Sequence, residues 1–174
     1  MIGLSGTEDV LLSKRISGSA AAMYVKKTPL RQRDPLSCQQ VVALDMLCKN
    51  GNNAAYRAAA GCFAFMVYGR CRLSDVCRVK NITFDLDSAG HGYIEASAIA
   101  TKTASSKEKR SMFLPLTAVV FPLSSCNWAV EWQLARTEAG LDDQTHLLPA
   151  PSSAGTWSDR PISAGEASRW LKDL

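Results

Sequence analysis

The sequence predicts an α+β fold that is mainly helical, with a small antiparallel β-hairpin or three-stranded sheet packed on a helical core. Apolar residues recur at helical spacing in four segments, and two of these segments open with an N-terminal capping box. Only the stretch between residues 81 and 120 alternates as β-strands do. With 174 residues, of which 47% are hydrophobic, the chain is long enough for one domain with a substantial core.

The first two helices are expected between residues 37 and 69. Ser37 is a good N-cap, and Gln40 three residues later completes a capping box, while Gly51 ends this helix. Asn53 can cap the second helix. This second helix is apolar on every side from Ala58 to Tyr68, which predicts a central, buried position.

The middle of the chain carries the predicted strands. A short helical turn, "RLSDVCRV", leads into "NITFDL", whose residues favour a strand. The next strand and its return form a hairpin around the polar turn "ASSKEK", and Pro115 indicates an edge position for the returning strand. One face of the hairpin is expected to carry Ile94, Ala96, Ala98, Ala100 and Lys102, and on the returning strand Met112, Leu114 and Leu116.

The last third of the chain is again predicted to be helical at both ends. Trp128, Trp132 and Ala135 recur at helical spacing before Gly140, and a Pro-, Ser- and Gly-rich loop is expected from Asp142 to Trp157. The final helix opens with a second capping box, Ser163 and Glu166, just after Pro161. Its Trp170 and Leu171 are expected to point to the core.

Charge is unevenly distributed along the chain, although the net charge is only +4. Up to Arg110 there are 16 Lys and Arg against 9 Asp and Glu, whereas the remainder has 4 against 7. This asymmetry favours a polyanionic partner. Residues 1–34 are interpreted as a basic linker or arm, either a solvated lead-in or a strap along a phosphate backbone.

Neither a membrane anchor nor a metal site is predicted. No apolar run reaches membrane-spanning length, and the N-terminus lacks a signal pattern, so an intracellular location is expected. The six cysteines form no Cys-x-x-Cys pair and there are only two histidines, of which His91 is interpreted as a loop residue. The cysteines are therefore expected to be reduced core residues, and neither a metal nor another cofactor is expected.

Three arginines follow the buried second helix within nine residues: Arg70, Arg72 and Arg78. Arginine rarely lies where water is scarce unless it has an anion to hold, so this cluster predicts an anion-binding site. Asp75 is three residues from Arg72 and is expected to hold that guanidinium in place. The alternative is that the two residues form only an ion pair at the end of a helix.

These residues resemble the catalytic domain of the tyrosine recombinases, the phage integrase family, over its first two-thirds. The family's first box is matched by Gly69, Arg72, Ser74, Asp75 and Val76, its hairpin lysine by Lys102 and Thr103, and its hydrophobic-Pro-hydrophobic strand end by "LPL". The helix "PLSCQQVVALDML" is similar to the opening helix of that domain. The resemblance covers residues 34–174 and is closest to recombinases of eukaryotic mobile elements.

The resemblance implies a DNA breaking-rejoining catalytic-domain fold and double-stranded DNA as the partner. In the family a tyrosine attacks a phosphodiester and forms a 3′-phosphotyrosine, within synaptic tetramers. Arg72 would bind the phosphate oxygens, Lys102 would protonate the leaving oxygen, and Asp75 would support Arg72. Arg70 is the rival of Arg72 for its role. The location would be nuclear in a eukaryote, and further DNA contacts would come from Arg70, Lys107, Lys109 and Arg110.

The chain also departs from the family pattern. His146 is followed by "LLP" rather than by an arginine at the third place, and the last tyrosine is Tyr93 on the hairpin. Residues 35–174 are therefore interpreted as a partial catalytic domain, truncated and inactive alone, because the His-x-x-Arg box and the nucleophile are missing. The alternative is a non-catalytic helical interaction module, or a DNA-binding remnant.

Overall fold

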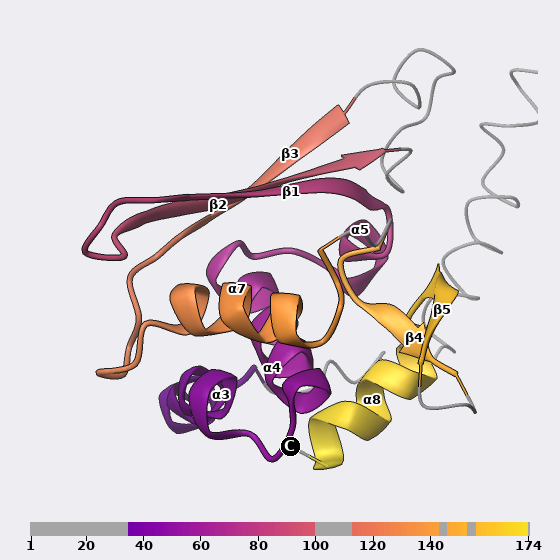
Figure 1. Ribbon diagram of the computed structural model, residues 1–174, viewed down its shortest axis with the longest axis horizontal. Coiled ribbons are helices and arrows are strands. Elements are labelled where there is room, and N and C mark those ends of the chain that lie inside the picture. The colour runs from indigo at the N-terminus through magenta and orange to yellow at the C-terminus, as the bar shows by residue number, and fades with distance from the viewer. Residues whose placement is uncertain (1–34, 100–112, 143–145, 153–155, 174) are drawn as a thin grey trace, which may run out of the picture. The chain divides into compact units, whose positions relative to one another are not determined.

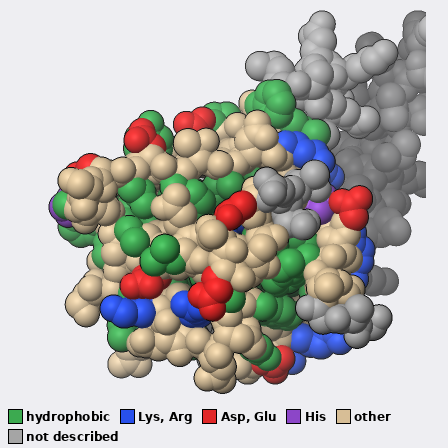
Figure 2. Space-filling view, viewed as in Figure 1, with side chains coloured by type: hydrophobic (Ala, Val, Ile, Leu, Met, Phe, Trp, Pro, Cys, Tyr) green, Lys and Arg blue, Asp and Glu red, His purple; other side chains and the backbone are tan. Residues whose placement is uncertain are grey.

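The computed structural model describes residues 35–99, 113–142, 146–152 and 156–173, which are coloured in Figure 1 and Figure 2. The described elements belong to one compact unit, Leu36–Leu174. The predicted arm at residues 1–34 and the hairpin tip, with Ala100, Lys102, Lys107, Lys109, Arg110 and Met112, lie outside the described residues.

The first two described helices begin and end where the sequence predicts. Helix α3 spans Cys38–Asn50, and both hydrogen bonds of its capping box form: Gln40 N donates to Ser37 Oγ at 3.3 Å, and Ser37 N donates to Gln40 Oε1 at 2.9 Å. Helix α4 spans Ala54–Tyr68 and is capped by Asn53, whose side chain accepts from Tyr56 N at 2.9 Å.

Helix α4 is the centre of the fold, as its apolar sequence predicts. All residues from Ala58 to Phe65 are buried. The helix packs against α3 on one side and against α7, Trp128–Glu138, on another. Gly61 allows the closest approach, because a Cβ at this position would lie 2.1 Å from Trp132 Cγ. The indole of Trp132 also donates to Ala58 O at 2.9 Å, which fixes the two helices together.

A three-stranded antiparallel sheet covers the helices (Figure 1). Its order is β1 (Val79–Leu86), β2 (Gly92–Ile99) and β3 (Phe113–Val119). The predicted alternation is confirmed, because Ile94, Ala96 and Ala98 are all buried. Pro115 lies on β3, which is an edge strand as predicted and tolerates a residue without an N–H group. The mixed helix-and-sheet class of the fold is thus confirmed.

The segment predicted as a loop from Asp142 to Trp157 contains more structure than its composition indicates. Strand β4, Pro149–Pro151, pairs with β5, Trp157–Pro161, in a small antiparallel sheet. Leu147 and Leu148 just before β4 are buried in the main core. This burial selects an extended path for a sequence whose prolines and serines otherwise favour turns.

The final helix, α8 (Ala164–Asp173), begins at its predicted capping box. Trp170 lies against Tyr56 with the ring centroids 5.2 Å apart, as expected for a core-facing residue. The prediction for Leu171 is wrong: its side chain is 45% exposed, because Trp170 and Ala167 make the contacts with the core. None of the described helices is both long and apolar enough to cross a membrane.

Candidate nucleic-acid interface

The arginine turn, which we define as residues 69–78, connects α4 to the sheet. Helix α4 ends when Gly69 N donates to Phe65 O at 2.9 Å and Cys71 N donates to Met66 O at 2.9 Å. Between them Arg70 has φ +51°, in the left-handed region that glycine usually occupies at this position. This left-handed residue therefore ends the buried helix.

Arg72 lies immediately before the short helix α5, Leu73–Val76. Its backbone is extended, and its carbonyl accepts from Asp75 N at 2.9 Å and from Val76 N at 3.1 Å. Arg72 is therefore an N-cap residue and not part of the helix. The expected ion pair with Asp75 is absent from the ion pairs of the described residues. Arg72 has the extended backbone of an N-cap residue, so the two side chains do not have the geometry of a pair within a helix.

The guanidinium groups of the arginine turn have no acidic partner in the part of the chain that is described. Arg70, Arg72 and Arg78 are all exposed, and none of them forms an ion pair or a side-chain hydrogen bond with a described residue. By contrast, Arg57 pairs with Glu138, and Arg160 pairs with Glu166. The three exposed cations are thus available to an external anion.

The end of strand β2 meets the arginine turn. Ile99 N donates to Arg78 O at 3.1 Å, and α5 contacts β2 (Figure 1). Lys102, the predicted general acid, lies outside the described residues. It follows Ile99 by three residues in the sequence, a length of chain that covers at most about 11 Å.

The described tyrosines do not supply a nucleophile to the arginine turn. Tyr93 lies at the other end of β2 from Ile99, roughly 20 Å away along a strand. Tyr68 donates its hydroxyl hydrogen to Asp45, with the oxygens 2.8 Å apart, and burial raises the pKa of this hydroxyl. Tyr56 packs on Trp170 in α8. Among the described residues, therefore, no tyrosine side chain is placed to attack a phosphate bound at the arginine turn.

The cysteines are free thiols, as predicted, and burial raises the pKa of five of them. Burial raises the pKa of Cys62 to about 12 and that of Cys71 to about 11, so both remain protonated at neutral pH. Cys38 is exposed rather than in the core. Within the described ranges, no group of three or more His, Cys, Asp or Glu side chains is placed to hold a metal ion.

Sequence reasoning missed the buried carboxylate of Asp45 on α3 and the buried guanidinium of Arg136 on α7. The Arg136 side chain is 3% exposed, and it donates to Leu147 O at 2.6 Å and to Leu141 O at 2.8 Å. Burial lowers the pKa of Arg136. The signal was present in the sequence, because position 136 continues the four-residue spacing of Trp128 and Trp132 and so lies on the buried face of the helix.

Comparisons of the chain with protein-family models, curated proteins and solved structures found no significant match. The class of protein is therefore argued from the residues of the site and their geometry. The described site consists of an exposed basic turn at the exit of a buried helix, beside the end of a β-strand.

Proposed function

We propose that this chain binds double-stranded DNA through the arginine turn, as part of a strand-cleavage site of the tyrosine recombinase type. The observation that carries the proposal is the exposed Arg72, which has no acidic partner among the described residues and lies directly before α5. An exposed guanidinium at a fixed backbone position is suited to two oxygens of one backbone phosphate.

The hydrogen bond between Ile99 and Arg78 supports a role for the hairpin in the same site. It ties the end of β2 to the arginine turn, and Lys102 follows three residues later in the sequence. A lysine reaching the same phosphate would add positive charge there and could protonate a leaving oxygen, while the guanidinium would stabilise charge on the non-bridging oxygens. We also propose that a longer protein containing this domain would assemble on DNA as a synaptic tetramer, as members of the tyrosine recombinase family do.

For the chain itself we propose that it binds duplex DNA but does not cleave it. A phosphodiester is cleaved in this chemistry only when a tyrosine oxygen displaces the 5′-oxygen at phosphorus, and the described tyrosines are remote from Arg72 or hydrogen-bonded elsewhere. We therefore expect weak, sequence-indifferent binding to duplex DNA and no covalent adduct with a nicked duplex.

The salt dependence of DNA affinity tests this proposal. For an Arg72→Gln variant we expect weaker binding, and a slope of log affinity against log salt that is shallower by about one. Arg169→Gln is the matched control, because it removes an exposed arginine of α8 that is not part of the arginine turn. Fluorescence anisotropy with a labelled duplex measures both quantities.

Two results would argue against DNA as the partner: no binding at low salt, or binding that does not respond to salt. Equal losses for Arg72→Gln and Arg169→Gln would mean that the arginine turn has no special part in binding. Any of these three outcomes would favour the alternative function, a non-catalytic helical interaction module.

A further inference from the structure

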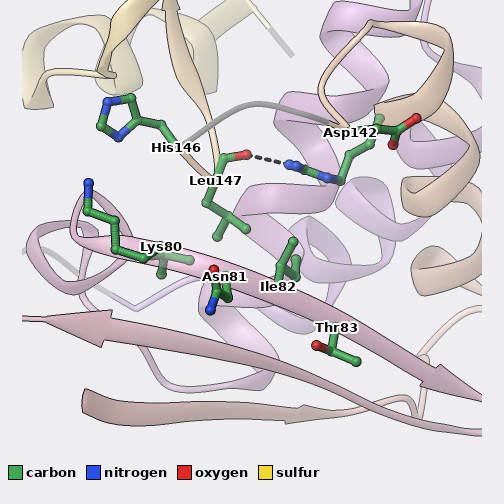
Figure 3. A pocket seen from close by; sticks show the side chains of 9 residues that line it. Lys80, Asn81, Ile82, Thr83, Asp142, His146 and Leu147 are labelled. Atoms are coloured by element: carbon green, nitrogen blue, oxygen red, sulfur yellow. Dashed lines mark hydrogen bonds between the residues drawn. The ribbon is translucent and has the colours of Figure 1, made fainter. Parts of the chain in front are cut away.

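A second cationic site lies outside the arginine turn, in a cavity of about 380 Å³ between β1 and the end of α7 (Figure 3). Residues Val79 to Thr83 of β1 form one wall. Arg136, Asp142, His146 and Leu147 line the other side. A cavity of this size lies within the range of small-molecule binding sites.

A β-bulge directs Lys80 to this cavity. The register of β1 and β2 shifts between Val79 and Asn81, which pair with the consecutive residues Ala98 and Ser97, so Lys80 has no partner on β2. Bulges commonly reorient one side chain next to a functional site. In Figure 3 the end of the Lys80 side chain points toward His146.

Arg136 brings a buried positive charge to the same cavity without a paired anion. Both of its hydrogen bonds are to neutral carbonyl groups, and its guanidinium lies 5.8 Å from the centroid of the Trp132 ring. It forms no ion pair with any carboxylate among the described residues. Asp142 also lines the cavity, and it lies on the opposite side from Lys80 and His146 (Figure 3). Burial lowers the pKa of Arg136 and the Asp142 carboxylate opposes this larger effect, and an anion in the cavity would offset the rest of the cost of burying this guanidinium.

His146 adds an unsatisfied polar atom. Its Nδ1 is shielded from solvent and has no hydrogen-bond partner, which is rare for buried nitrogen atoms. The cavity is thus lined by positive charge that forms no ion pair with a described residue, and by a histidine that has one shielded nitrogen without a hydrogen-bond partner.

We propose that this cavity binds a phosphate group, held by Lys80, Arg136 and His146. A tetrahedral oxyanion can accept hydrogen bonds from donors on several elements at once, and these three residues come from β1, α7 and the segment before β4. The phosphate belongs either to a small phosphomonoester or to a DNA backbone that also crosses the arginine turn. The site goes beyond the proposed function, because it uses none of the exposed arginines of that turn.

Nuclear magnetic resonance of the two histidine rings tests the proposal with inorganic phosphate at constant pH and ionic strength. We expect the His146 resonances to shift and saturate, while those of His91 stay in place. Lys80→Met should weaken phosphate binding about tenfold, since it removes one charge-assisted hydrogen bond. Lys172→Met on α8 removes a lysine elsewhere on the surface and should leave the affinity unchanged.

The absence of a saturable His146 shift would overturn the proposal, as would equal affinities for Lys80→Met and Lys172→Met. The Arg72→Gln variant distinguishes phosphate binding in the cavity from DNA binding at the arginine turn. It should bind inorganic phosphate as the parent does, even if its DNA binding is lost. Titration with duplex DNA identifies the source of the phosphate. The same His146 shift with DNA supports a backbone phosphate in the cavity, and a shift with free phosphate only supports a phosphomonoester.

Discussion

At the scale of single residues, Arg70 is the most informative position in the arginine turn. It holds φ +51° at the end of α4, where a residue with a side chain costs about 1 kcal/mol relative to glycine. A left-handed arginine at this place is consistent with a side chain retained for binding and not for stability.

We predict that Arg70→Gly raises the free energy of unfolding by about 1 kcal/mol and at the same time weakens DNA binding. The gain arises because glycine adopts positive φ without strain. Chemical denaturation and anisotropy measure the two effects on the same protein. Arg70→Lys is the control, since it keeps both the charge and the strained backbone and should change neither quantity appreciably. A less stable glycine variant, or one that binds DNA as tightly as the parent, would refute the interpretation.

At the same scale, Arg136 and Arg72 show what sequence reasoning can and cannot supply. The spacing from Trp132 was enough to place Arg136 on the buried face of α7. Buried arginines are rare, however, so the residue type argues against the position that the spacing indicates. The expected Arg72–Asp75 pair failed because it depended on the exact residue at which α5 begins. Helix boundaries are the least certain part of any sequence-based assignment.

At the scale of elements, the helices were predicted well because their ends are encoded locally. Ser37 with Gln40, Asn53, and Ser163 with Glu166 each satisfy backbone groups within three residues of themselves. Strands β4 and β5 were not predicted because they are short and rich in proline and serine, which favour turns, although they lie close together in the sequence. Pro149 and Pro161 lie opposite each other only once the core has buried Leu147 and Leu148.

Two glycines on different helices should respond in opposite ways to the same substitution. Gly61→Ala should lower the free energy of unfolding by about 3 kcal/mol, because its Cβ would lie 2.1 Å from the Trp132 ring between α4 and α7. Gly165→Ala on α8 meets nothing within 4 Å and should stabilise the protein by about 0.5 kcal/mol. Urea denaturation compares the two variants. Similar effects at both positions would mean that α4 and α7 do not pack as closely as described.

The N-terminus of α8 should make stability depend on acidity. Arg160 donates to both carboxylate oxygens of Glu166, at 2.7 and 2.9 Å, and this pairing together with the bonds from Ser163 lowers the pKa of Glu166 well below its ordinary value of 4.5. Because the pKa is lower in the folded state, the stabilisation is fully present above pH 4.5 and is lost as the pH falls below it.

Glu166→Gln isolates this effect, because glutamine keeps the capping box and removes the charge. We expect the parent to be the more stable protein near neutral pH, and the difference in unfolding free energy to shrink as the pH falls below 4.5. Thermal denaturation over a series of acidic buffers records this difference. A gap between the two proteins that is the same at every pH would exclude the ion pair as its origin.

At the scale of the whole molecule, the mixed helix-and-sheet class followed from the sequence, but the relation between the arginine turn and the hairpin did not. Periodicity fixes which residues face a core, and it does not fix which loops meet at one end of a sheet. The hydrogen bond between Ile99 and Arg78 supplies that information. The central claim of the proposed function builds on this bond: we propose that Arg72 and Lys102 contact the same phosphate.

A double-mutant cycle on duplex affinity tests this claim most directly, with Arg72→Gln, Lys102→Gln and the combined variant measured at low salt. Two cations on one phosphate should be coupled, so the combined loss in binding free energy should differ from the sum of the single losses by about 0.5 kcal/mol or more. Strict additivity of the two losses would place the side chains on separate phosphates and would contradict the account.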